Sequence, residues 1–280
     1  MGVVSRPAAC TEALVLRVWP CGETSAVVSL LTLDHGYIKV IAKAARGPRS
    51  RLRPLIEPGR LVTAEFSLDP QRELQFLRGG EVDLDPMADG ATLERSAYLL
   101  GALELVDRCR PLGGAGPHEA EAEAAGGLFD VCGRFVRMLS SRSCTRMALL
   151  FFAFEWELLA RHGMAPEVSV CVSCGHPRSE WELSTLRFNP AEGGVVCGTC
   201  VTSGGVTGGQ PLGEEALDHL GELALGGIDL IGTTMDSPDL PRPMRRELGA
   251  LLHRFLGYHL PGYRLPAALE LLRARKDSSG

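Results

Sequence analysis

Residues 171–200, CVSCGHPRSEWELSTLRFNPAEGGVVCGTC, contain two pairs of cysteines with the same internal spacing. Two residues separate Cys171 from Cys174 and Cys197 from Cys200, and 22 residues lie between the pairs. A two-residue gap lets both sulfurs of one turn face the same ion, and two such turns joined by a hairpin supply four thiolates in a tetrahedron. The segment therefore predicts a closed structural site for one Zn²⁺ per chain, with these four cysteines as ligands.

The four cysteines have alternative uses, namely two disulfides, four buried thiols that only pack, or a CxxC redox pair. A redox pair would explain only one of the two pairs. Glycines at 175, 193, 194 and 198 suit the metal site, because glycine lets backbone amides turn toward sulfur. Four protein ligands leave no open position for water or substrate, so we expect the site to stabilise the fold and not to catalyse. His176 could replace a cysteine, but four cysteines already suffice.

The composition is that of a globular protein in a reducing compartment. The chain has 280 residues, of which 45% are hydrophobic and 22% are charged, enough for two domains and a small module. No apolar run reaches the roughly 18 residues of a membrane span, and residues 1–9 lack the apolar core of an export signal. Five scattered cysteines are typical of reduced thiols. We therefore expect a cytoplasmic protein with no membrane partner.

The first 82 residues predict a small β-barrel. Short runs with strand composition are separated by turn sequences, and they cover residues 11–19, 25–33, 37–42, 61–68 and 74–77. Five short strands in some seventy residues, with no long helical pattern, predict a closed barrel of the OB-fold type.

Beyond residue 83 the apolar residues recur at helical spacing. The predicted helices cover residues 91–110, 119–139, 145–162, 213–225, 241–260 and 265–276. The chain is thus predicted to be an α+β multidomain protein. It would consist of an OB-fold barrel (1–82), a helical domain in two parts (83–167 and 205–280), and a zinc module (168–204) between those parts. Zinc would hold together a segment with too few apolar groups to fold alone.

Positive charge is concentrated between Lys39 and Arg60. The whole chain carries −5, but this window carries +6, which leaves −11 for the remainder. Arginine is suited to phosphate oxygens because its planar guanidinium donates two parallel hydrogen bonds. We therefore predict phosphate contacts from the seven basic residues of the window, which are Lys39, Lys43, Arg46, Arg49, Arg51, Arg53 and Arg60.

Three of these arginines alternate along the chain. Because Pro48 and Pro54 favour extended backbone for the residues before them, Arg49, Arg51 and Arg53 are predicted to project to one side of an extended segment. Such a row would hold the nucleic-acid backbone without reading the bases. Two alternatives remain: a loop kept polar for solubility, or an adaptor protein whose basic loop grips an acidic partner segment without touching DNA.

Aromatic residues that could stack on bases are few in the predicted barrel. Tyr37 is the best candidate, whereas strand alternation assigns Phe66 and Phe76 to the core.

The sequence contains no catalytic motif that we recognise. G-x-S-x-G, a phosphate-binding loop and H-E-x-x-H are all absent, so we expect a protein that is not an enzyme. A metal-dependent hydrolase remains a rival of another class, and a chelator would distinguish it, because a structural site predicts loss of folding on metal removal.

The order and combination of these motifs resemble the RecO family of bacterial recombination-mediator (DNA repair) proteins. The resemblance covers nearly the full chain, and its motifs lie at residues 23–24, 31–36, 42–52, 159–166, 171–175, 193–200 and 258–272. Two departures are Ala44, where relatives usually have glycine, and the acidic, glycine-rich stretch 112–127, which does not align.

The resemblance implies a DNA-binding mediator of recombination and repair. It implies an OB-fold, a helical domain and structural zinc, together with binding to single- and double-stranded DNA and annealing of complementary strands. The partners that it implies are RecR and single-stranded-DNA-binding protein, with which such a protein assists the loading of RecA on covered single strands. That role places the protein at the nucleoid.

Overall fold

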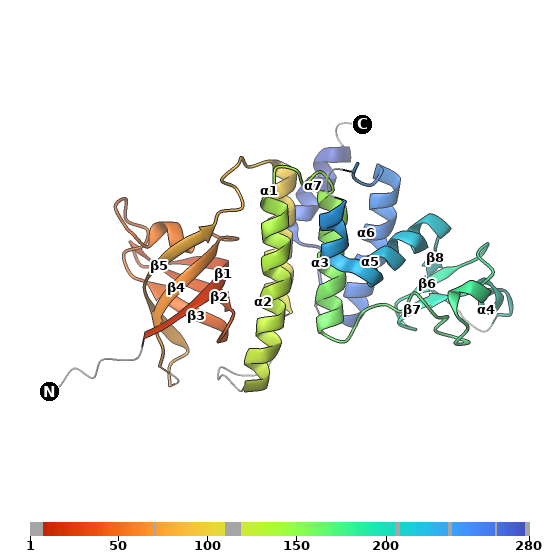
Figure 1. Cartoon of the computed structure of the whole chain (residues 1–280), viewed down its shortest axis with the longest axis horizontal. Coiled ribbons are helices and arrows are strands. Elements are labelled where there is room, and N and C mark those ends of the chain that lie inside the picture. Colours follow the sequence, from red (N-terminus) through yellow and green to blue (C-terminus); the bar gives the residue numbers. More distant parts are fainter. Residues whose placement is uncertain are drawn as a thin grey trace. The chain divides into compact units, whose positions relative to one another are not determined.

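The computed structural model describes residues 8–69, 71–109, 119–204, 208–234, 237–260 and 262–277 (Figure 1). The chain forms two compact units. Met1–Arg142 and Pro266–Gly280 make up the first, called the barrel unit below, and Ser143–Leu265 make up the second, called the cysteine unit. Within the described ranges, no helix combines the length and the apolar composition needed to cross a membrane.

Five strands of the barrel unit close into a barrel, which confirms the predicted OB-like fold. They are β1 (Ala8–Cys21), β2 (Ser25–Thr32), β3 (Gly36–Ala42), β4 (Leu61–Ser67) and β5 (Leu74–Leu84). Their spatial order is β1-β2-β3-β5-β4, and β4 closes the barrel by pairing with β1. The β3–β5 pair is parallel and the other pairs are antiparallel.

Strand β5 is longer than the predicted segment 74–77. Gly79 and Gly80 broke the apolar pattern in the sequence, but they continue the strand through an irregular register with β4. At Gly80, which has a φ of 146°, an added Cβ would lie 2.2 Å from the carbonyl oxygen of Thr63. The glycine therefore permits a close approach of two strands and does not end the strand.

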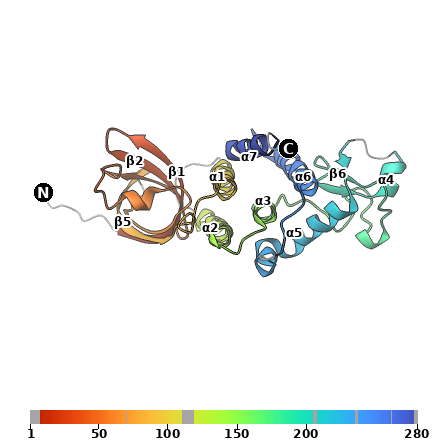
Figure 2. The same cartoon turned by 90° about the horizontal axis from the view of Figure 1, so that it is seen from above.

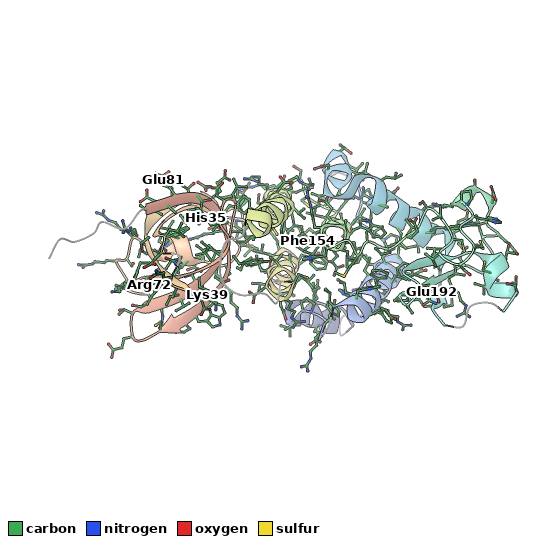
Figure 3. The ribbon with its side chains drawn as sticks, turned by 90° about the horizontal axis from the view of Figure 1, so that it is seen from below. His35, Lys39, Arg72, Glu81, Phe154 and Glu192 are labelled. Carbon is green, nitrogen blue, oxygen red and sulfur yellow. The ribbon has the colours of Figure 1, made fainter. Side chains whose placement is uncertain are left out.

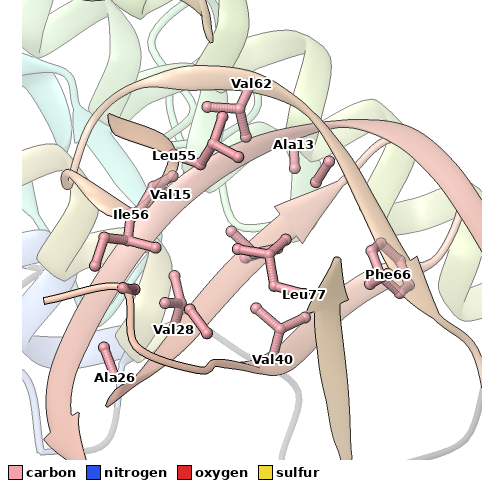
Figure 4. Close-up of a cluster of buried hydrophobic side chains, with 14 residues drawn as sticks. Ala13, Val15, Ala26, Val28, Val40, Leu55, Ile56, Val62, Phe66 and Leu77 are labelled. Atoms are coloured by element: carbon pink, nitrogen blue, oxygen red, sulfur yellow. The ribbon is translucent and has the colours of Figure 1, made fainter. Parts of the chain in front are cut away.

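Alternate residues of the strands point inward and fill the barrel. Figure 4 shows this cluster, with Phe66 at one end and Leu55 and Ile56 at the other. Leu55 and Ile56 come from a one-turn 3₁₀ helix, η1 (Arg53–Ile56), which follows β3. Phe66 is fully buried as predicted, whereas Phe76 is only half-buried and lies outside the core cluster.

Three helices complete the barrel unit: α1 (Leu93–Arg108), α2 (Glu119–Ser140) and α7 (Ala267–Asp277). Helix α1 begins at a Thr92 cap whose side chain accepts a hydrogen bond from the Arg95 N–H. Helices α1 and α7 lie side by side, with Leu269 packed over Gly101 (Figure 2). Helix α2 contacts β1, β2 and β3, and Gly126 brings it close to the carbonyl oxygen of Leu33.

The cysteine unit is built on three longer helices, α3 (Met147–Arg161), α5 (Glu214–Thr233) and α6 (Arg242–His259). Helix α3 is apolar on nearly all sides and packs against both others. Helix α5 runs beyond the predicted end at residue 225, through a kink at Gly227 with a φ of 50°. The Glu157 carboxylate accepts a hydrogen bond from the Ile228 N–H at 2.8 Å, which restarts the helix after the kink.

The cysteine-bearing segment folds as a small sheet with short helical turns. The strands are β6 (Arg187–Asn189), β7 (Gly194–Val196) and β8 (Gln210–Pro211), in the order β7-β6-β8. The turns are η2 (Arg178–Glu180) and α4 (Gly198–Thr202). Hairpin β6–β7 brings the second cysteine pair back toward the first.

Candidate nucleic-acid interface and metal centre

The four predicted cysteines come together in the cysteine unit. Their Sγ atoms all lie within 4.8 Å of one another. Cys171 and Cys200 are 4.0 Å apart at sulfur, and Cys174 and Cys197 are 3.8 Å apart. A tetrahedron with metal–sulfur bonds of about 2.3 Å has edges of about 3.8 Å. The four side chains are therefore positioned to bind one metal ion.

Backbone amides stabilise the thiolate of one of the four cysteines. The Cys197 N–H donates to the Cys171 Sγ at 3.3 Å. Burial disfavours the Cys171 thiolate, but N–H donors from Cys197, Cys174 and Ser173 outweigh it and lower the pKa of Cys171 to about 6. Burial instead raises the pKa of Cys197, and it raises the pKa of Cys200 to about 12, so a metal ion would have to displace protons from these two thiols. His176 is exposed, lies outside the sulfur cluster, and approaches Glu180 at 3.9 Å.

Residues 168–204, called the metal module below, are attached to the helices of their own unit. Arg178 forms an ion pair with Asp218 of α5, and Phe188 of β6 packs against Phe255 of α6, with ring centroids 5.7 Å apart. Within the module, the Trp181 indole N–H donates to the carbonyl oxygen of His176 at 2.8 Å. These contacts suit a structural brace between α5 and α6.

Residues 43–60, called the basic loop below, connect β3 to β4. The prediction of an extended segment here was wrong. The N–H groups of Gly47, Ser50 and Arg53 bond to carbonyl oxygens three residues earlier, at 3.1, 3.2 and 3.4 Å, so the loop is a succession of turns. Pro54 sits in the first turn of η1, where its fixed φ favours helix and it needs no N–H partner.

Apolar residues anchor the basic loop to the barrel. Ala45, Leu55 and Ile56 are buried in the barrel core. At the end of the loop, the Gly59 N–H donates to Val15 O at 2.8 Å, and the Val15 N–H donates to Arg60 O at 3.0 Å. The loop is therefore a fixed surface at one end of the barrel, with its apolar side turned inward.

The charged side chains of the loop are turned to solvent. Exposure alternates as predicted despite the turns, because the half-buried Ser50 and Leu52 separate three exposed arginines. The exposed cations are Lys43, Arg46, Arg49, Arg51 and Arg53, and none of them forms an ion pair with a carboxylate in the part of the chain that the structure describes.

Two exposed cations contact neighbouring elements of the barrel. Arg46 Nη1 donates to Gly22 O in the β1–β2 turn at 3.3 Å. The Lys43 ammonium lies 5.0 Å from the centroid of the Phe76 ring on β5. These contacts leave the charge uncompensated and accessible.

Three other predicted contact residues have partners within the protein. Lys39 forms an ion pair with Glu73, with 2.6 Å between Nζ and Oε1. Figure 3 shows the position of Lys39 on the barrel, on the same side as Arg72 and opposite Glu81. The Tyr37 hydroxyl donates to Val106 O of α1 at 3.0 Å, so this ring joins the barrel to a helix.

Arg60 is the third residue of this kind. Its guanidinium donates to Asp85 Oδ2 at 3.1 and 2.6 Å. Burial alone would raise the pKa of Asp85, but the Met87 N–H and Arg60 outweigh it and hold that pKa below its usual value. The pair holds the start of β4 against the chain after β5.

Further candidate residues lie on strands; the sequence had assigned one of them, Phe76, to the core and had not singled out the others. Trp19 and Arg17 are outward on β1, and the Arg17 guanidinium lies 5.1 Å from the Trp19 ring centroid. Phe76 and Arg78 are outward on β5. The sequence did not identify these residues as a possible binding surface, because a strand's sequence does not tell which of its outward residues will be covered by helices.

Comparison with known proteins finds matches along almost the whole chain. The model described as "Recombination protein O N terminal" matches residues 8–83, and "Recombination protein O C terminal" matches residues 90–268. The "DNA repair protein RecO" of Anaeromyxobacter dehalogenans (strain 2CP-C) is 33% identical over 91% of this chain and 92% of its own length. Proteins of that name from Desulforudis audaxviator and Bacillus pumilus are 29% and 26% identical, over 96% and 94% of this chain.

Proposed function

This chain belongs to the RecO family of DNA repair proteins, and from that premise we propose that it binds DNA through its basic loop as a mediator of homologous recombination. The observation that carries the proposal is the set of five exposed cations on the basic loop, which have no carboxylate partner among the described residues. In a chain of net charge −5, such a local concentration attracts a polyanion.

The chemistry of the loop suits the DNA backbone. Arg49, Arg51 and Arg53 each offer a planar donor pair that matches a phosphate. Phosphate contacts are independent of base sequence, so the protein would hold both single- and double-stranded DNA. Neutralising phosphates on two complementary strands also reduces their repulsion, which is the physical basis that we propose for annealing.

Family membership supports the remaining roles. We propose RecR and single-stranded-DNA-binding protein as direct partners, and assistance to RecA loading on covered single strands as the outcome. These roles place the protein at the nucleoid in the cytoplasm. They need binding and no bond-breaking chemistry, which fits a protein that is not an enzyme.

For the metal we propose one structural Zn²⁺ per chain. Four cysteine thiolates at tetrahedral spacing suit zinc, and they complete its coordination without an open position. The ion would hold residues 168–204 as one module between the two parts of the helical domain.

The proposal is tested with Arg49→Ala, Arg51→Ala and Arg53→Ala combined. We expect this variant to lose affinity for a bare oligonucleotide at least tenfold, to about the same extent for unrelated sequences, because each lost phosphate contact removes a charge-assisted hydrogen bond. Fluorescence anisotropy with labelled single strands and duplexes, without any partner protein, measures the loss.

A matched control removes the same charge from another surface. Arg161, Arg246 and Arg254 are exposed on α3 and α6, and their combined change to alanine should alter affinity much less. Unchanged affinity in the loop variant would refute the assignment. If the wild-type protein fails to bind bare DNA at all, the adaptor that grips an acidic partner segment becomes the better explanation of the loop.

A further inference from the structure

Four half-buried apolar side chains form a row across the outside of the barrel. Strand register places Trp19 of β1 opposite Val27 of β2, Val27 opposite Ile41 of β3, and Ile41 opposite Phe76 of β5. Their strand neighbours, such as Val28, Val40 and Leu77, point into the core. The row, called the apolar row below, is therefore a continuous outward-facing strip that crosses four strands.

A second outward row is covered by helices, whereas the apolar row is not fully covered. The two rows are separated by the row of Arg17, Ser29 and Lys39. Leu14, Leu31 and Tyr37 face one another on β1, β2 and β3. Leu14 and Leu31 are fully buried, because α1 and α2 pack on this part of the barrel and Tyr37 bonds to Val106 of α1. All four members of the apolar row keep part of their surface in solvent.

Cations surround the apolar row. The Arg17 guanidinium is 5.1 Å from the Trp19 ring centroid, and the Lys43 ammonium is 5.0 Å from that of Phe76. Arg78 is exposed two residues after Phe76 on the same strand. Acids are nearby as well. Asp107 lies 3.7 Å from Arg17, Glu73 pairs with Lys39, and the exposed Glu65 carboxylate lies beside Gly79, the residue after Arg78.

We infer that the apolar row is a stacking platform for the unpaired bases of single-stranded DNA, with Trp19 and Phe76 as the stacking side chains. This inference rests on the proposed DNA binding by the basic loop, and it adds the feature that separates single strands from duplexes. Aromatic faces stack on any exposed base, while flanking cations hold the phosphates. Bases in a duplex are already stacked on one another and cannot reach the row.

The basic loop and the apolar row are contiguous. Lys43 belongs to the loop and lies over Phe76, and Arg46 of the loop contacts the β1–β2 turn two residues after Pro20. A strand whose phosphates lie on the loop can therefore place its bases on the row. The charge around the row selects a polyanion over an apolar peptide as the occupant.

Intrinsic fluorescence provides a direct test. Trp156 and Trp181 are only 4% and 8% exposed, so Trp19 is the one half-exposed tryptophan of the three in the chain. We expect oligo-dT to quench the wild-type emission and a duplex of equal length to quench it far less. The difference should vanish in Trp19→Phe, which keeps an aromatic face but removes the reporter. Equal quenching by both forms of DNA would overturn the inference.

Alanine variants test the energetic role. Trp19→Ala and Phe76→Ala should each weaken single-strand binding about 5- to 100-fold and change duplex binding by less than about twofold. Trp19→Phe and Phe76→Tyr should restore single-strand affinity. Leu100→Ala, which removes an exposed apolar side chain of α1, is the control for loss of surface area. Melting temperatures identify any alanine variant whose fold is affected. If an alanine variant is destabilised, single-strand affinity in Trp19→Phe and Phe76→Tyr decides whether the aromatic face is needed.

The outcomes separate this inference from the proposed function. Loss of both DNA forms in the loop variant, with unchanged single-strand binding in Trp19→Ala and Phe76→Ala, would refute the stacking platform and leave phosphate binding intact. Unchanged binding in the loop variant would refute the proposed function itself. Equal losses of single-strand and duplex binding in the aromatic variants would also refute stacking, because only unpaired bases can use the row.

Discussion

At the residue scale, Ala44 occupies a backbone position that disfavours it. It is the only non-glycine residue with positive φ in the described chain, at 54°. A side chain in this region costs roughly 1–2 kcal/mol, because Cβ approaches the carbonyl oxygen. Ala44 lies at the start of the basic loop, and its N–H donates a hydrogen bond to Ser25 Oγ at 3.2 Å. An alanine at this position therefore has a structural cost.

Ala44→Gly should stabilise the protein. Glycine removes the positive-φ strain from the folded state, but it also raises the conformational entropy of the unfolded chain. The first free-energy change is the larger, so we expect the unfolding free energy to rise by about 0.5–1 kcal/mol. Urea unfolding measures it. Ala88→Gly, at an exposed turn without positive φ, should instead lower stability by a few tenths of a kcal/mol, roughly. Destabilisation by Ala44→Gly would contradict the backbone conformation described.

Asp85 gives the barrel unit a pH dependence. Its pKa is lowered in the folded protein relative to 3.8, because the stabilising Arg60 and Met87 donors outweigh the opposing effect of burial. A lowered carboxyl pKa contributes stability that is fully present above the unfolded pKa, and this contribution is lost as pH falls through the folded pKa. Asp85→Asn should therefore be less stable than wild type at pH 7.

The deficit of Asp85→Asn should shrink as pH falls below 3.8, where the wild-type carboxylate also becomes protonated. Urea titrations at pH 7 and pH 3 compare the two proteins. Glu81→Gln, an exposed substitution on the same barrel, is the control for loss of one negative charge. A deficit of the same size at both values of pH would show that shape, and not charge, explains the effect.

At the element scale, the basic loop differs most from its sequence-based description. Pro48 and Pro54 suggested extended backbone, but burial of Leu55 and Ile56 in the open end of the barrel supports a 3₁₀ turn. Apolar burial of this kind contributes more than the local preference of a residue before proline. The arginines stay exposed in either conformation, since no charged side chain can enter that core.

The metal module is the other element with a testable role. Cys174→Ser should abolish stoichiometric metal binding and lower the melting temperature of the cysteine unit, because the segment would lose the proposed ion that holds its turns together. Metal analysis and thermal unfolding by circular dichroism measure both effects. Cys10→Ser, an exposed cysteine of the barrel unit, is the control. Retention of one metal ion per chain in Cys174→Ser would contradict the four-cysteine site.

At the scale of the whole molecule, an acidic chain carries a local basic surface. The window from Lys39 to Arg60 has +6, although Lys39 and Arg60 are paired with Glu73 and Asp85. The five exposed loop cations have no carboxylate partner among the residues that the structure describes, and they dominate the field near one end of the barrel, while net negative charge elsewhere repels DNA. This asymmetry would orient the molecule on a strand.

Salt dependence should report these contacts. If the five loop cations release counterions from a single strand, log K should fall with log salt at a slope of about −3.5, and the triple arginine variant should fall at about −1.4. Binding titrations from low to moderate salt give the slopes. The control with Arg161, Arg246 and Arg254 replaced should keep the wild-type slope, and a slope unchanged in the loop variant would exclude phosphate contacts there.

The sequence by itself determined the elements and the chemical types of the sites. Cysteine spacing, strand and helix periods and the basic window are local patterns, so they predicted the barrel, the helices, the cluster of four cysteines and the cationic loop.

Only the tertiary structure decided which side chains are available. The Tyr37 hydroxyl donates a hydrogen bond to α1, and Lys39 and Arg60 form ion pairs with carboxylates from distant parts of the chain. Trp19 and Phe76 belong to the same outward row because strands far apart in sequence pair in the barrel. Long-range pairing and helix packing are set by the global burial of apolar surface, which no local pattern encodes.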